Sequence, residues 1–208
     1  MGGLAGFVDF NGPGGCPGLG RAMSEHISRR GRGLISGGPY DDRVELWRIG
    51  PGKPVFRENQ GLVLDGAVYN RRELSAVLGL SDASDEDLIA SLLEARGHDG
   101  LTLVNGDFAG ALFDRGRNEL TLFRDRFGVR PLVWTRIGGR VYFASAPKAL
   151  AVVPGFDLVP NQAMLFDYLG VHYRYLYRDP ARTFFHNVFQ VPPAGVVRFT
   201  SSHETIHS

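Results

Sequence analysis

Four short apolar segments follow one another closely in the second half of the chain, and this pattern restricts the possible fold more than any other feature. They cover residues 108–113, 119–124, 132–135 and 141–144. The connections Arg115-Gly116-Arg117 and Ile137-Gly138-Gly139 have the length and glycine content of hairpin turns. The 28 Gly and 12 Pro residues agree with many tight turns. The sequence therefore predicts a strand-rich domain with short connections.

The rest of the chain mixes strands with helices. Ser84 precedes an acidic first turn and is expected to cap the helix that follows it. Residues 31–39 are expected to form a glycine-rich loop. Strands are predicted at 4–10, 44–48 and 61–66, and helices at 22–30, 70–78, 85–95, 146–152 and 162–169. The length of 208 residues fits one α+β domain with a short appendage.

Charge and hydropathy exclude several classes of partner. The formal net charge is +1, from 23 basic and 22 acidic residues, so no basic face for nucleic acid is implied. There is no apolar stretch long enough to span a membrane and no pattern typical of a signal peptide. A single cysteine allows no internal disulfide, which fits a reducing compartment. We therefore expect a cytoplasmic protein that binds neither nucleic acid nor membranes.

The sequence contains no metal-binding or Cys–His hydrolase pattern. With one cysteine and no paired-ligand motif that combines cysteines with the six histidines, the sequence predicts no metal site. Cys16 lies in a Gly/Pro-rich loop without an adjacent histidine. We interpret it as a surface thiol rather than a nucleophile.

Seven segments resemble, in order and in spacing, those of the class II glutamine amidotransferases, and the asparagine synthetases most of all. They are MGGLAGF (1–7), LDGAVYNRREL (64–74), SDEDLIASLLE (84–94), NGDFAGALFD (105–114), FRDRFGVRPL (123–132), FASAPKAL (143–150) and FFHNVFQVPPAG (184–195). The resemblance implies the N-terminal-nucleophile hydrolase fold, with two stacked antiparallel sheets between helical layers. It also implies that the charged residues of FRDRFGVRPL are structural and form buried or half-buried ion pairs.

Position 2 departs from this family. There, removal of Met exposes a cysteine whose thiolate attacks glutamine while its own α-amino group takes the proton. Here the residue is Gly2, which has no sulfur. The resemblance therefore implies a glutaminase domain that has lost its nucleophile.

The oxyanion-hole segment departs as well. The family's Asn-Gly-Glu is replaced by Asp65, Gly66 and Ala67. Asp65 carries no side-chain amide, and its carboxylate would repel a developing oxyanion. Two positions could retain a glutamine pocket: Asp85, which matches the residue that holds the α-amino group, and Arg43, which matches the carboxylate-binding arginine if one residue is deleted nearby. Each also has a structural alternative, Asp85 in a helix first turn and Arg43 at a strand edge.

The resemblance also implies a division of the chain. Residues 1–170 would form the glutaminase-like domain, and residues 171–208 a connector toward an ATP-dependent synthetase domain that the chain lacks. ATP and Mg²⁺ would then be needed only in that domain, and this chain would hold no cofactor. The SGGPYDD segment (36–42) is interpreted as a turn rather than an ATP loop because its fifth residue is Tyr40 instead of Asp. A synthetase domain or subunit is the expected partner, with a homodimer as an alternative, and the apolar cluster at 184–189 is expected to be exposed.

Three functions remain open at this point. The first is an inactive scaffold domain, as in the β-lactam synthetases and the cyclases of lasso peptide biosynthesis, whose substrates carry their own amine. The second is a glutamine-hydrolysing domain of an asparagine synthetase, which requires a cysteine at position 2. The third is a glutamine-binding module that uses Asp85 and Arg43.

Overall fold

Two antiparallel sheets form the centre of the molecule. The computed structural model describes residues 2–12, 16–28, 34–171 and 179–207. The first sheet contains, in order, β10 (Phe189–Gln190), β8 (Val133–Ile137), β9 (Arg140–Ala144), β1 (Gly3–Asp9), β3 (Val44–Ile49) and β2 (Ile35–Asp41). The second contains β12 (Glu204–His207), β11 (Val196–Phe199), β7 (Glu119–Arg124), β6 (Gly106–Asp114), β5 (Gln60–Val68) and β4 (Val55–Phe56).

The main core lies between the two sheets. Leu4, Val44 and Leu46 of the first sheet belong to one buried cluster with Val63 and Ala111 of the second. Side chains alternate along a strand, so each sheet presents its other face to helices. This stacking confirms the predicted α+β arrangement of two sheets between helical layers.

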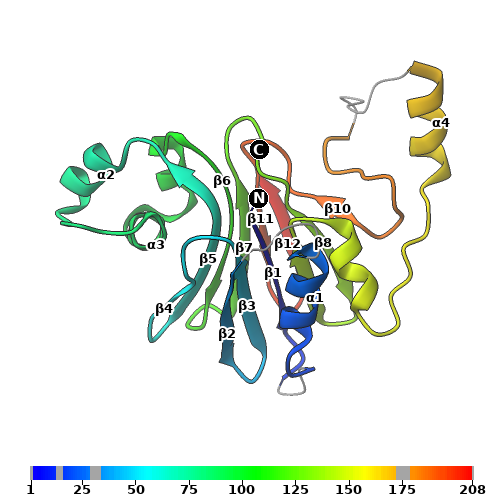
Figure 1. Cartoon of the computed structure of the whole chain (residues 1–208), viewed down its shortest axis with the longest axis horizontal. Helices are drawn as coiled ribbons and strands as arrows, with labels where there is room; N and C mark the ends of the chain where they lie inside the picture. Colours follow the sequence, from blue (N-terminus) through cyan, green and yellow to red (C-terminus); the bar gives the residue numbers. More distant parts are fainter. Residues whose placement is uncertain (1, 13–15, 29–33, 172–178, 208) are drawn as a thin grey trace.

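Helices cover the two outer faces (Figure 1). On the first sheet lie α1 (Leu19–Ser28) and the short 3₁₀ helix η2 (Pro147–Val152); on the second lie α2 (Arg71–Leu78), α3 (Asp85–Arg96) and the 3₁₀ helix η1 (Gly97–Leu103). The side chain of Ser84 accepts a hydrogen bond from the backbone N–H of Asp87, which confirms the predicted cap. The remaining helix, α4 (Gln162–Val171), stands at the edge of the molecule in Figure 1.

The prediction of a glycine-rich loop at residues 31–39 was wrong for residues 35–39. Residues 35–41, which include most of SGGPYDD, form β2 and pair with β3. β2 is the last strand of its sheet, where Pro39 can sit because an edge strand has free N–H positions. Gly37 has φ +134°, and a Cβ atom there would collide with the carbonyl oxygen of Leu46. The glycines therefore permit close strand pairing instead of preventing it.

The last part of the segment predicted as a connector contributes strands to both sheets. Residues 189–190 pair with β8, and β11 pairs with β7 on one side and with β12 on the other. The expected exposure of the 184–189 cluster was only partly right. Val188 is buried, Phe184 and Phe185 are half-buried, and Phe189 is exposed.

At the end of β7, Arg124 and Asp125 are structural, as expected, and they act through hydrogen bonds to the main chain. Arg126 is exposed and forms none of the expected ion pairs with the residues that the structure describes. The guanidinium of Arg124 donates to the carbonyl oxygens of Arg130, Val191 and Gly128, the first two at 2.7 and 2.6 Å. The carboxylate of Asp125 accepts from the N–H groups of residues 127, 129 and 130 at 3.0–3.2 Å. These bonds fix the loop that joins β7 to β8.

Helices long and apolar enough to cross a bilayer are absent from the described parts of the chain.

Candidate functional site around Gly2

Gly2 lies directly before β1, at a point where an added side chain would meet the carboxylate of Asp65. A Cβ atom built on it would contact Oδ1 of Asp65 at less than any normal separation. The same atom would lie 3.2 Å from the carbonyl oxygen of Ile49 and 3.3 Å from Nη1 of Arg48. The second sheet thus supplies, through Asp65, a group that occupies the space where a side chain of residue 2 would begin.

Asp65 and Arg48 form a buried ion pair that joins the two sheets. Nη1 of Arg48 donates to Oδ1 of Asp65, and the two residues are 3% and 2% exposed. Arg48 also donates from Nε to the carbonyl oxygen of Pro51 at 3.0 Å and from Nη1 to that of Gly3 at 3.4 Å. Burial of a charge is costly unless a partner compensates it, so each member holds the other in place.

Glycines bring the main chain close to this pair. Gly66 follows Asp65 with φ +137°, and a Cβ atom there would collide with the carbonyl oxygen of Asp107 on the paired strand β6. The Gly50-Pro51-Gly52 turn covers the site from the other side. Gly50 (φ +106°) would place a Cβ atom 3.3 Å from the Cα atom of Gly2. The main chain at Gly50 and Gly66 therefore occupies space beside the ion pair that larger residues could not leave to it.

Glu86 of α3 adds a second buried carboxyl group beside Arg48. It is buried, and a Cβ atom on Gly52 would contact its Oε1 atom. Burial raises the pKa of the Glu86 carboxyl group, while the positive charge of Arg48 acts in the opposite direction. The cluster thus contains one guanidinium and two carboxyl groups.

The structure gives Asp85 a structural role. Oδ2 of Asp85 accepts the backbone N–H of Val68 at 2.9 Å, and Oδ1 pairs with Nε of Arg71 at 3.1 Å. Asp85 joins the first turn of α3 to the end of β5, one residue before Glu86 in the sequence.

Arg43 is not brought to this site. Gly3 pairs with Ile49 and Val8 pairs with Val44, so Arg43 lies beyond the opposite end of β3 from Gly2. There it contacts Oδ2 of Asp41 at 3.7 Å and donates to Oδ1 of Asn118 at 3.3 Å. The arginine at the site is Arg48, which sequence reasoning missed.

The arrangement lacks a nucleophile within the described residues around Gly2. Cys16 packs against the cluster on the outer face of the first sheet, whereas Asp65 lies between the sheets. A carboxylate ligand that approached Arg48 would first have to displace Asp65. No group of three or more His, Cys, Asp or Glu side chains in the described chain could hold a metal ion.

A family model described as the glutamine amidotransferase domain matches residues 51–208. The chain belongs to this family. Within the glutamine amidotransferase domain family, it is 34% identical over 103 residues to asparagine synthetase [glutamine-hydrolyzing] 2 of Bacillus subtilis, a match that covers 47% of this chain and 14% of the relative. It is also 34% identical over 106 residues to asparagine synthetase [glutamine-hydrolyzing] 2 of Oryza sativa subsp. japonica, covering 48% of this chain and 18% of the relative. The chain thus spans less than a fifth of these relatives.

Two solved structures share the fold of this chain. The glutamine phosphoribosylpyrophosphate amidotransferase of B. subtilis, complexed with ADP and GMP, superposes with a TM-score of 0.63 at 14% identity, over 99% of this chain and 48% of its own. A structure described as the allosteric regulatory enzyme of purine biosynthesis gives a TM-score of 0.61 at 14% identity, over 100% of this chain and 48% of its own. This likeness confirms the N-terminal-nucleophile hydrolase type of fold predicted from the sequence.

Proposed function

We propose that this amidotransferase domain does not hydrolyse glutamine and serves as the scaffold of an ATP-dependent amide-forming unit. The observation that carries this proposal is the position of the Asp65 carboxylate beside Gly2. The nucleophile position has no side chain, and a carboxylate fills the space that such a side chain would need.

The oxyanion side of the reaction is impaired by the same residue. A tetrahedral intermediate needs hydrogen-bond donors aimed at its oxygen, and loss of one donor typically lowers the rate by about 10²–10³. At the corresponding position Asp65 offers an acceptor, and its carboxylate is already committed to Arg48. The missing nucleophile and the missing hydrogen-bond donor therefore both support a domain that does not hydrolyse glutamine.

Such a domain suits an enzyme that needs no ammonia. β-Lactam synthetases and the cyclases of lasso peptide biosynthesis, which this sequence resembles at these positions, activate a carboxylate with ATP and let an amine of the same substrate attack it. ATP and Mg²⁺ would bind the synthetase unit, and this chain would hold no cofactor. We place the complex in the cytoplasm.

The surface of α4 is the contact that we propose for the synthetase unit. Phe166 and Leu169 are 72% and 65% exposed, and Leu165 and Tyr168 beside them are exposed as well. Asp167 is the helix's charged residue, and it pairs with Arg182 at 3.8 Å. An exposed apolar helix surface with its charge paired is typical of an interface.

The deciding experiment measures ammonia release from glutamine by three purified proteins: the native chain, Gly2→Cys, and Gly2→Cys combined with Asp65→Asn. Intact mass must show that Met1 has been removed, because the reaction needs a free α-amino group on residue 2. We expect no release by the native chain and none by the single variant. Release by the native chain above the rate without protein would contradict the proposal.

A glutamine-hydrolysing function is the second candidate, and the 34% identity to glutamine-hydrolysing synthetases favours it. The third candidate, a glutamine-binding module that uses Asp85 and Arg43, is less favoured by the geometry, because Arg43 lies beyond the opposite end of β3 from Gly2 and Arg48 is already paired with Asp65. Equilibrium dialysis with labelled glutamine distinguishes the two, since binding without ammonia release would support only the module.

A further inference from the structure

A cavity of about 360 Å³ lies on the face of the second sheet that is turned away from Gly2. Its floor includes Phe108 and Val196, which belong to the buried cluster beneath α3. Leu101 and Val104, at the end of η1, form an apolar wall. Because Asp65 is on the opposite face of the same sheet, the cavity is separate from the site described above.

Two arginines and two histidines surround this apolar floor. Arg124 and Arg126 come from the end of β7, while His98 comes from η1 and His207 from β12. The cavity's carboxylate is Asp99, whose side chain is 85% exposed and contacts Nε2 of His98 at 3.5 Å. The lining is therefore apolar below, with two arginines, two histidines and one aspartate at the rim.

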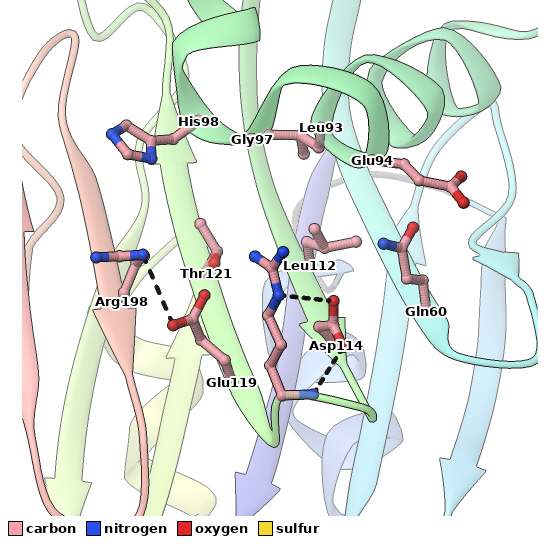
Figure 2. Close-up of a pocket in the computed structure, with 11 residues that line it drawn as sticks. Gln60, Leu93, Glu94, Gly97, His98, Leu112, Asp114, Glu119, Thr121 and Arg198 are labelled. Atoms are coloured by element: carbon pink, nitrogen blue, oxygen red, sulfur yellow. Dashed lines mark hydrogen bonds and ion pairs between the residues drawn. The ribbon is translucent and has the colours of Figure 1, made fainter.

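His98 borders both this cavity and a smaller one, and its ring stacks on that of His207. Their centroids are 5.2 Å apart with an interplanar angle of 24°, which is a stacked arrangement. His98 also borders the neighbouring cavity of about 220 Å³ (Figure 2), and Nη2 of Arg198 lies 3.4 Å from Nε2 of His207. The stacked pair presents a flat polarizable surface at the end of the larger cavity.

The ion pairs distinguish the two cavities. In the smaller one, Arg198 pairs with Glu119 at 3.8 Å and Arg117 pairs with Asp114 at 3.9 Å. Figure 2 shows Arg198 and Glu119 facing each other. In the larger one, Arg126 makes no ion pair with any residue that the structure describes. A cation without a carboxylate partner, next to an apolar floor, can bind an external anion without breaking an existing contact.

We propose that the larger cavity binds a small organic anion that has a flat apolar body and a single carboxylate or phosphate group. The body would lie over Phe108 and Val196 beside the histidine pair, and the anionic group would face Arg126. The volume falls at the lower end of the range for small-molecule sites, which have a mostly apolar lining and few polar anchors.

Phenyl phosphate is the probe for the test, titrated into the full chain by calorimetry and followed by the imidazole NMR signals. We expect saturable binding that shifts the signals of His98 and His207 and leaves that of His186 unchanged. Arg126→Gln should weaken binding by about tenfold or more, as expected for loss of a charge-assisted hydrogen bond. The matched control is Arg117→Gln, whose native side chain is 73% exposed and already paired, and it should leave the affinity unchanged.

A second variant tests the cavity independently of charge. Thr102 is exposed at the rim, so Thr102→Trp should fill the opening and abolish binding while the unfolding midpoint stays the same. Binding of benzyl alcohol as tight as that of phenyl phosphate would overturn the role of the anion. Absence of saturable binding, or equal affinity in the Arg126→Gln protein, would overturn the proposal.

Discussion

The carboxylate of Asp65, on the second sheet, fills the space beside the Cα atom of Gly2, at the start of the first. The two residues are 63 positions apart in the chain, and Arg48 holds the carboxylate where it is. Glycine at position 2 and aspartate at position 65 therefore depend on each other.

This dependence predicts a coupling between the two positions in a double-mutant cycle. Gly2→Ala should destabilise the native protein by about 1–3 kcal/mol, because the added methyl group collides with Asp65 in a packed site. In an Asp65→Ala background the same substitution should cost clearly less. Urea unfolding of the four proteins measures the coupling. If Gly2→Ala costs the same stability in both backgrounds, Asp65 is not what restricts residue 2 to glycine.

The ion pair itself should be necessary for stability. Asp65→Ala leaves the guanidinium of Arg48 buried without its partner, so we expect a loss of about 3–5 kcal/mol. The matched control is Glu25→Ala, which breaks the exposed Arg21–Glu25 pair at 3.1 Å on α1 and should cost less than about 1 kcal/mol. Urea unfolding at neutral pH measures both. A loss below 1 kcal/mol for Asp65→Ala would mean that water reaches Arg48.

Glu86 should make stability depend on pH in a defined direction. Burial raises the pKa of its carboxyl group above the ordinary 4.5, so the folded protein holds this proton more tightly than the unfolded chain does. Stability from this group is therefore fully present below pH 4.5 and declines as the pH rises through the folded-state pKa. Glu86→Gln should remove that decline.

We therefore expect Glu86→Gln to be more stable than the native protein at pH 8, with the difference shrinking as the pH falls toward 4.5. Unfolding free energies of both proteins across this range measure the effect. A variant that is less stable by the same amount at every pH would show instead that Arg48 requires a charged Glu86.

The apolar surface of α4 should promote association. Phe166→Asp should reduce self-association of the isolated chain and change the unfolding free energy by no more than about 0.5 kcal/mol, since the side chain is exposed. Sedimentation velocity measures the association. Phe127→Asp provides the control, because Phe127 is 80% exposed on the loop after β7 rather than on α4, and its substitution should not alter the association. An unchanged sedimentation profile for both variants would argue against α4 as an interface.

Local sequence patterns predicted the elements that are built from local interactions. The hairpins around Gly116 and Gly138 and the cap at Ser84 depend on a few adjacent residues, and they are in place. β2 was missed because an edge strand buries little and its Gly-Gly-Pro run has no apolar alternation. Its formation depends on the neighbouring strand β3, which a local pattern does not contain.

The site was only partly predicted, again because a local pattern does not contain contacts with distant strands. Gly2 and Asp65 were identified, but Arg48 was missed because its partner is on the other sheet. A signal was available in the alternation of β3, where Arg48 shares a face with Val44 and Leu46. Asp65 likewise shares a face with Val63 on β5. Two opposite charges on core-facing positions indicate a buried pair, whereas Arg43 lies before the strand begins.

The place of β1 inside its sheet has a consequence for biosynthesis. β1 pairs on one side with residues 44–49, which follow it closely in the sequence, and on the other with residues 140–144, which lie far from it in the sequence. Contacts between such distant parts of a chain form slowly. During synthesis β1 and β3 can therefore pair before residues 140–144 have been made, and the sheet around β1 is completed only after the hairpin of β8 and β9 has formed.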